Sequence, residues 1–234
     1  RARFAALCLF DDCVEHCGHL AAKKYSSQLA DGALLGVAKD GGDDGVQQVA
    51  LYGLSQVARC GAEESLVPHA QGLVDTLVTI ASHSKDEAEN LFVIENAVSA
   101  LMALIFVGRA PFAGLKFIDT ARVLGAVLSQ LPLREDEDEA KICHAGFCDL
   151  VERGVITQTD VILTIVGNTL VYCDAGEDLV DHSTMTRFAE MLLGMERSVP
   201  GDTLQANFGR LSPDAKRCIQ GVMEQYSRAN VVTP

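Results

Sequence analysis

Four glycine residues recur along the chain at nearly even intervals, and this recurrence constrains the fold more than any other feature of the sequence. Gly18, Gly61, Gly108 and Gly154 are separated by 43, 47 and 46 residues. Each follows a stretch whose apolar residues recur at helical spacing, and glycine commonly occupies the position just after a helix. A second helical pattern follows each glycine. This interval predicts HEAT or armadillo repeats, in which two helices occupy about 40 to 47 residues.

We expect these helices to form an all-α, right-handed solenoid of HEAT repeats, built from antiparallel helix pairs. A single pair cannot bury its apolar face alone, so neighbouring pairs must stack to form a continuous core. The first helix of each pair is expected in the outer, convex layer and the second in the inner, concave layer. The expected units are approximately residues 1–40, 44–83, 86–133 and 135–174, followed by a C-terminal cap at 175–234.

Apolar spacing and helix-end residues predict several helices more closely. Ser212 as the cap and Pro213 at the first helical position predict the start of the last helix. Residues 177–197 are predicted to form one helix, and the sequence VPGD at 199–202 predicts a break. The positions expected to repeat along helix faces in the second and third units are Leu73, Leu77, Ile80, Leu91, Ile94, Val98, Leu101, Ile105, Val123, Val127 and Leu131.

Composition narrows the possible partners. The net charge of −13 argues against nucleic acid, since phosphate binding needs a basic surface, and it suits basic protein partners. No apolar run reaches the roughly 18 residues of a membrane-spanning helix, so no membrane partner is expected. No GxGxxG, GxSxG, HExxH or phosphate-binding loop occurs, and no nucleophile stands at a useful spacing from a base. We therefore expect a binding protein that is not an enzyme and needs no cofactor.

The eight cysteines are scattered along the chain, mostly in apolar helical settings. With no visible signal peptide, reduced thiols in a cytosolic or nuclear protein are the simpler interpretation. The chain opens at Arg1 inside a helical pattern, so we expect a fragment of a longer protein. Apolar positions such as Leu7 and Phe10, or their neighbours in the second helix, would then be uncovered.

The stretch CLFDDCVEHCGH, residues 8–19, allows two interpretations. Three candidate ligands, Cys13, His16 and Cys17, share one arc of a helix and could bind zinc. Structural zinc sites usually combine ligand pairs from separate elements, and no CxxC or HxxxH occurs here. The favoured interpretation is an amphipathic helix without metal. Its buried stripe would be Ala6, Phe10, Cys13 and Cys17, and its exposed side Asp11, Glu15 and His19.

Acidic residues concentrate at one predicted connector, LPLREDEDEA at residues 131–140. Its five consecutive acids, Glu135 to Glu139, are most simply a solvated turn followed by the acidic start of a helix. The helix macrodipole favours negative charge at that end.

Five stretches, in order along the chain, resemble the importin-beta superfamily of nuclear import receptors, and most closely the importin-five (karyopherin-beta-three) group. They are RARFAALCLFDDCVEHCG, VALYGLSQVARCG, VIENAVSALMALI, LSQLPLREDEDEAK with FCDLVE, and TLQANFGRLSPDAKRCIQ. The resemblance implies the last four or five HEAT repeats of such a receptor. Residues 174–203 match poorly, and Gln47 follows Val46 where first helices of HEAT repeats often carry arginine.

By this resemblance, the chain takes part in carrying protein cargo with basic signals through the nuclear pore, shuttling between cytoplasm and nucleus. The GTPase Ran in its GTP form releases cargo, mainly through more N-terminal repeats, and phenylalanine-glycine nucleoporins contact the receptor in the pore. The alternative is a HEAT scaffold that holds a phosphatase or another complex together.

The candidate partner-binding residues are Asp31, Asp75 and Asp160, which are polar positions on second helices of three different pairs. Neighbouring second helices of a solenoid could align these acids on the concave side, where a basic signal could reach them together. The acidic connector, Glu135 to Glu139, lies outside those helices and serves as the comparison set.

Overall fold

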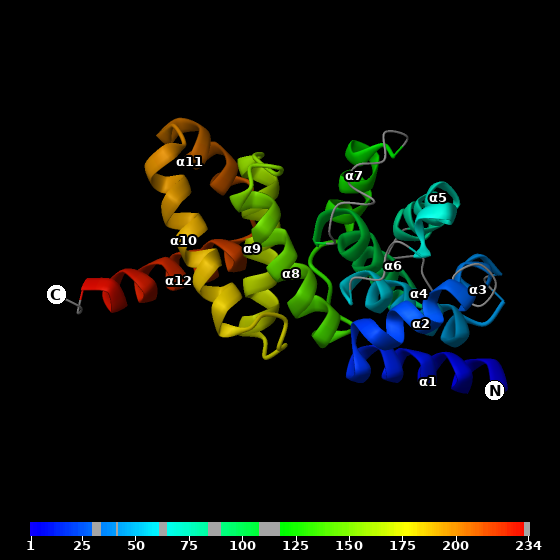
Figure 1. Cartoon of the computed structure of the whole chain (residues 1–234). Helices are drawn as coiled ribbons and strands as arrows, with labels where there is room; N and C mark the ends of the chain where they lie inside the picture. Colours follow the sequence, from blue (N-terminus) through cyan, green and yellow to red (C-terminus); the bar gives the residue numbers. More distant parts are fainter. Residues whose placement is uncertain (30–33, 41, 61–64, 84–89, 108–117, 232–234) are drawn as a thin grey trace. The chain divides into compact units, whose positions relative to one another are not determined.

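The computed structural model describes residues 1–29, 34–40, 42–60, 65–83, 90–107 and 118–231, and these residues form helices and connectors with no β-strand (Figure 1). The predicted all-α class is therefore confirmed for the described part of the chain. The chain divides into two compact units, residues 1–130 and 131–234. Each unit is described by itself below.

The helices of the first unit pack as successive neighbours. Helix α4 contacts both α1 and α6, α5 contacts α6 and α7, and α2 contacts α1 (Figure 1). A π-helical turn, η4 (Met102–Val107), continues α6, and a short 3-10 helix, η3 (Val67–His69), precedes α5. The α-helices are α1 (Ala2–Cys17), α2 (His19–Leu29), α3 (Gly36–Asp40), α4 (Asp44–Arg59), α5 (Ala70–Ala81), α6 (Leu91–Leu101) and α7 (Thr120–Gln130).

The core of the first unit follows the predicted apolar spacing. The side chains of Leu73, Leu77 and Ile80 in α5 are buried, as are the predicted α6 and α7 positions Ile94, Val98, Leu101, Val123 and Val127. Leu91 and Leu131 are only partly buried, and the side chain of Ile105 lies outside the described residues. Helix α6 also buries polar residues, whose hydrogen bonds offset the loss of water. One of them, Ser99, accepts a hydrogen bond from Arg59 of α4.

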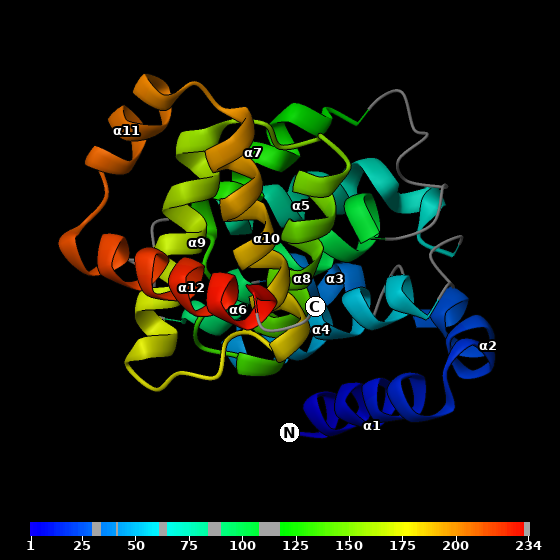
Figure 2. The same cartoon turned by 90° about the vertical axis from the view of Figure 1, so that its left-hand side faces the viewer.

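The second unit contains α8 (Glu137–Glu152), α9 (Thr159–Asp174), α10 (His182–Ser198), α11 (Gly201–Gly209) and α12 (Pro213–Val231). Helix α12 packs across α9 and α10, as Figure 2 shows. A Cβ atom added at Gly167 of α9 would lie 3.1 Å from the Cβ of Ala215 in α12. The absence of a side chain at Gly167 therefore lets these two helices approach closely, beside the buried side chain of Ile219.

Two of the four recurring glycines follow helices, as predicted, and both have a positive φ angle: Gly18 has φ 64° and Gly154 has φ 70°. The ψ angle of Gly18 is −148°, a combination essentially restricted to glycine. Gly61 and Gly108 lie outside the described residues. The regular interval did not identify Gly176, which has φ 102° after α9.

Side-chain caps fix several helix starts. Ser212 accepts a hydrogen bond from the backbone N–H of Ala215, as predicted for the start of α12. Asp181 accepts one from the N–H of Thr184 at 2.6 Å, so α10 begins at His182 instead of residue 177. The predicted break after α10 is confirmed, because α10 ends at Ser198 and α11 begins at Gly201.

Helix α1 is rotated relative to the prediction. Its buried residues are Leu7, Phe10, Asp11 and Val14. The predicted stripe members Ala6 and Cys17 are exposed, and Cys13 is only partly buried. Leu7, Phe10 and Val14 are larger than Ala6, Cys13 and Cys17, so this rotation buries more apolar surface. It also buries Asp11. Leu7 and Phe10 are covered, whereas Leu20 of the second helix, α2, is exposed, which agrees with the other half of the prediction.

Candidate functional site

Two of the three predicted partner-binding acids, Asp75 and Asp160, lie within the described residues, one in each unit. Asp31 lies outside the described residues. Asp75 lies on α5 of the first unit, whereas Asp160 lies in the first turn of α9 in the second unit. Each acid therefore has to be considered in its own surroundings.

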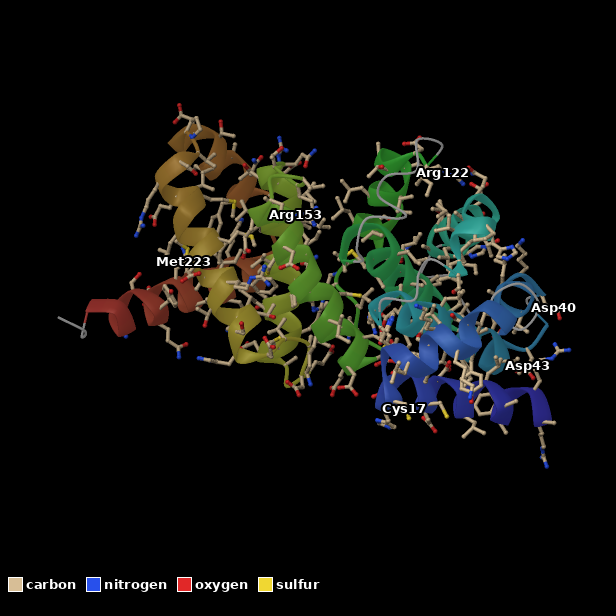
Figure 3. All side chains as sticks on the ribbon, in the orientation of Figure 1. Cys17, Asp40, Asp43, Arg122, Arg153 and Met223 are labelled. Atoms are coloured by element: carbon tan, nitrogen blue, oxygen red, sulfur yellow. The ribbon has the colours of Figure 1, made fainter. Side chains whose placement is uncertain are left out.

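Asp75 joins two helices of the first unit. Its carboxylate accepts a hydrogen bond from the Gln71 side chain at 2.7 Å and from the guanidinium of Arg122 at 2.8 Å. Figure 3 shows Arg122 at the start of α7. The hydrogen bonds from Gln71 and Arg122 lower the pKa of Asp75, so this carboxylate is ionised at neutral pH. Arg122 neutralises much of its charge, and Asp75 is less available to a basic partner than its sequence position predicts.

Asp160 is exposed in the first turn of α9, where the helix macrodipole favours a negative charge. Its backbone carbonyl accepts a hydrogen bond from the Thr164 hydroxyl at 2.8 Å, one turn later. Its side chain remains accessible to solvent and to a partner.

The comparison set, Glu135 to Glu139, includes acids that are hydrogen-bonded or buried in the structure. Asp136 caps α8 by accepting a hydrogen bond from the backbone N–H of Glu139 at 3.1 Å. Burial is the largest cause of the raised pKa of Asp136. Glu139 is only 2% exposed, so one of the three acids in the first turn of the helix is buried. The helix start itself agrees with the prediction, because α8 begins at Glu137.

Further acids from the α9–α10 connector lie beside this helix start. We define the acidic edge as Glu135, Glu137, Asp138, Glu177 and Asp178. The backbone N–H of Asp178 donates to the Glu137 carboxylate at 3.4 Å, which joins the two groups of acids. The sequence did not predict that these two groups of acids lie close together, because their proximity depends on how α8 packs within the second unit.

Two basic residues hold the acidic edge together. The guanidinium of Arg134 donates two hydrogen bonds to the Glu177 carboxylate and lies 3.8 Å from the ring centre of Tyr172. Lys141 pairs with Asp178 at 2.6 Å. Hydrogen bonds to Glu177 and Asp178, respectively, raise the pKa values of Arg134 and Lys141. Glu135, Glu137 and Asp138 are exposed and make the edge negative overall.

Arg187 connects α10 to α8 in the second unit. It donates to the carboxylates of Asp149 at 2.5 Å and Glu152 at 2.7 Å, and to the carbonyl oxygen of Ala145 at 3.1 Å. The bond to Glu152 is the largest cause of the raised pKa of Arg187. Sequence reasoning missed this connection, since the arginine is 35 residues or more away from each partner.

An apolar groove of about 300 Å³ lies among α9, α10, α11 and α12 of the second unit. Glu196 adds a carboxylate to its lining, and Met223 of α12 is labelled in Figure 3. The main apolar side chains of the groove are Leu163, Leu192, Leu204, Phe208, Ile219 and Met223.

The candidate zinc ligands Cys13, His16 and Cys17 form no metal-binding group with other residues that the structure describes. Cys17 ends α1 and is exposed (Figure 3). No group of three or more His, Cys, Asp or Glu residues suited to a metal occurs within the described ranges. All eight cysteines lie within the described residues, and none of them forms a disulfide bond. Burial raises the pKa of Cys148 to about 12, so this thiol stays protonated and is a poor nucleophile at neutral pH.

A search of protein-family profiles finds none that matches this chain. Among the helices that the structure describes, none combines the length and apolar character needed to cross a membrane.

Proposed function

We propose that this chain is part of a nuclear import receptor of the importin-beta superfamily and that its helices form a right-handed HEAT solenoid. In this proposal it binds protein cargo with basic signals and shuttles between cytoplasm and nucleus. Phenylalanine-glycine nucleoporins contact the receptor in the pore. Ran in its GTP form releases the cargo, mainly through repeats outside this chain.

The order of helix neighbours in the first unit carries this proposal. The predicted first helices contact one another in sequence, α1 with α4 and α4 with α6. Two successive second helices, α5 and α7, also contact each other. Stacked helix pairs produce this pattern of nearest neighbours. It supports a repeat array, and the five stretches that resemble receptor repeats suggest which array it is.

Gln47 is a departure from the HEAT pattern: repeats often carry arginine at this position, in a ladder that links one repeat to the next. Its side-chain amide donates a hydrogen bond to the backbone carbonyl of Ala38 at 2.8 Å. Ala38 lies in α3 and Gln47 in α4, so this bond connects one predicted repeat to the next. A neutral side chain thus makes a connection that an arginine ladder makes in many repeats of this class.

The charge distribution supports a basic partner. The chain carries a net charge of −13, and exposed carboxylates include Asp160 and most of the acidic edge. A lysine-rich signal would gain favourable Coulomb energy on approach, and salt would screen this attraction over about 8 Å at physiological ionic strength.

The proposal is tested by the binding of a fluorescent lysine-rich peptide to the purified chain. The control is a peptide of equal length with each lysine replaced by glutamate. We expect anisotropy to report binding of the basic peptide alone, with affinity falling steeply as salt rises. Equal binding of both peptides, or no binding of either, would count against cargo binding by this chain.

Ran distinguishes the import receptor from the scaffold. In the full-length protein, bound basic cargo should be released when Ran loaded with a GTP analogue is added, and retained with Ran loaded with GDP. Cargo that stays bound under both conditions would instead favour a HEAT scaffold subunit.

A further inference from the structure

One acidic side chain in the first unit is buried without a hydrogen-bond partner. Asp11 of α1 is 3% exposed, and neither of its carboxyl oxygens has a partner among the described residues. Burying an ionised carboxylate without a partner is strongly unfavourable, and a group in such a position normally takes up a proton.

The carboxyl of Asp11 lies directly against α4. A Cβ atom at Gly53 of α4 would lie 2.5 Å from Oδ1 of Asp11 and 3.0 Å from the Leu34 side chain. The neighbouring residues on the same face of α1, Leu7, Phe10 and Val14, are also buried. Asp11 is therefore enclosed by backbone and apolar side chains at the contact between α1 and α4.

Nearby charges on α1 make ionisation of Asp11 harder. Burial is the largest cause of the rise in its pKa from 3.8 to about 8, and the negative charges of Asp12 and Glu15 add to it. Both of these acids are exposed on α1.

The elements packed around α1 offer no described cation that pairs with Asp11. On α4, Arg59 donates to Ser99 and Tyr52 donates to Glu15. His19 of α2 bonds to the carbonyl of Cys60. Arg3 of α1 lies 3.9 Å from Asp40 of α3. The other charged or titratable side chains on α1 to α4, or directly before α1 and α4, are Arg1, Cys8, Cys13, His16, Cys17, Lys23, Lys24, Tyr25, Lys39, Asp43 and Asp44.

We propose that α1 is attached to α4 through a proton-dependent contact: Asp11 must be protonated for α1 to pack against Gly53, so rising pH releases α1. Helix α1 lies at an edge of the first unit in Figures 1 and 2, so it can separate without opening the α4–α6 contact. Separation gives Asp11 access to water, and its proton passes to solvent. It also uncovers the apolar face formed by Leu7, Phe10 and Val14.

Hydrogen exchange of the α1 amides tests this contact in the whole chain. The pKa of Asp11 is about 8 when α1 is packed and returns to its ordinary value of 3.8 when α1 is open. Between roughly pH 4 and 8 only the open state loses the proton, so the equilibrium constant for opening should rise about tenfold per pH unit. Protection factors for α1, corrected for intrinsic exchange, should therefore fall about 100-fold from pH 5 to pH 7. In Asp11→Asn, which keeps the shape but cannot ionise, this fall should disappear.

Two controls make the result specific. Asp12→Asn removes a neighbouring negative charge but keeps the buried carboxyl of Asp11. Exchange of the α1 amides should therefore still depend on pH, but because the pKa of Asp11 is lower in this variant, the dependence should end at a lower pH. The amides of α8 in the second unit should behave identically in all three proteins. Equal pH dependence of α1 in the native chain and Asp11→Asn would overturn the proposal.

If Asp11→Asn does not fold, a direct titration of Asp11 in the native chain tests the proposal instead. Carbon-13 chemical shifts of the Asp11 carboxyl in the native chain should show a midpoint near pH 8. A midpoint below pH 5 would show that the carboxyl is ionised while α1 is packed, and the proposal would be wrong.

Discussion

The carboxyl group of Asp11 in α1 lies against the backbone of Gly53 in α4, where a Cβ atom would be only 2.5 Å from Oδ1. An acid and a glycine, neither of which marks a core position in the sequence, thus lie against each other where these two helices pack. The acid is buried, and its pKa is raised to about 8 mainly by that burial. We therefore expect the stability of the first unit to depend on pH, through Asp11, and on the size of the side chain at position 53.

The first prediction concerns stability and pH in Asp11→Asn. The folded-state pKa of Asp11, about 8, lies above its ordinary value of 3.8, so the folded chain holds this proton more tightly than the unfolded chain. The contribution of Asp11 to stability is therefore fully present below pH 4 and is lost as pH rises to about 8. Each pH unit in that window should cost the native chain up to about 1.4 kcal/mol relative to the variant.

Urea unfolding of both proteins at several pH values measures this difference. The comparison removes contributions from other groups, such as Asp136, whose pKa is also raised. The total should not exceed about 5 kcal/mol, because water entry and local movement relieve part of the cost. Parallel stability curves for the native chain and Asp11→Asn between pH 4 and 8 would contradict the prediction.

The second prediction concerns Gly53→Ala. The new methyl group would overlap with the Asp11 carboxyl and press on Leu34, so we expect a loss of about 1–3 kcal/mol in unfolding free energy. Asp11→Ala removes the group that the methyl meets. In the double variant, the loss caused by Gly53→Ala should shrink by at least half, and a double-mutant cycle by chemical denaturation measures this coupling.

If the two substitutions are simply additive, the cost of Gly53→Ala arises from Leu34 or from the backbone, and not from Asp11. Gly72→Ala on α5 provides a comparison at another glycine in the first unit, because its nearest contact is the flexible end of Lys39 at 3.4 Å. It should have little effect or be slightly stabilising.

The contrast between these glycines and the recurring ones shows what the sequence can predict. Helix ends at Gly18 and Gly154 follow from local chain chemistry, since glycine alone adopts those φ and ψ angles without strain. The burial of Leu73 and Leu77 follows from their spacing, because α5 has one clearly apolar face.

Helix α1 shows where such reasoning fails. It has apolar residues on more than one face, so periodicity allows two rotations that differ by little. The choice depends on packing against α4, and it brings Leu7 and Val14 inside together with Asp11. For the candidate site, the sequence identified Asp75 as polar and exposed, but not its pairing with Arg122, 47 residues away. That pairing depends on how α5 and α7 pack.

The third prediction concerns Gly154→Ala. Gly154 has φ 70° and no other atom close enough to obstruct a side chain, so its cost is purely conformational. We expect a loss of about 1 kcal/mol or somewhat more in unfolding free energy, measured by thermal or chemical denaturation. Gly125→Ala is the matched control, since Gly125 lies within α7 and also has open space around it. That substitution should stabilise the chain by about 0.5–1 kcal/mol. Equal effects at both sites would mean that the positive φ carries no cost.

The last prediction compares two sets of acids for binding a lysine-rich peptide. Replacing Asp31, Asp75 and Asp160 with asparagine should weaken binding about tenfold, equivalent to about 1.4 kcal/mol. Within this set, Asp75→Asn alone should contribute least, because Arg122 and Gln71 already occupy its carboxylate. Fluorescence anisotropy at fixed ionic strength gives the affinity of each variant.

The matched set is Glu135→Gln, Glu137→Gln and Asp138→Asn on the acidic edge, which removes the same number of charges. It should weaken binding less, because Arg134 and Lys141 lie beside these acids and reduce their attraction for a cation. Equal losses from the two sets would mean that the peptide responds only to net charge, through an attraction that salt screens. A larger loss from the acidic edge would move the partner-binding surface to the start of α8, where Glu135, Glu137 and Asp138 are exposed.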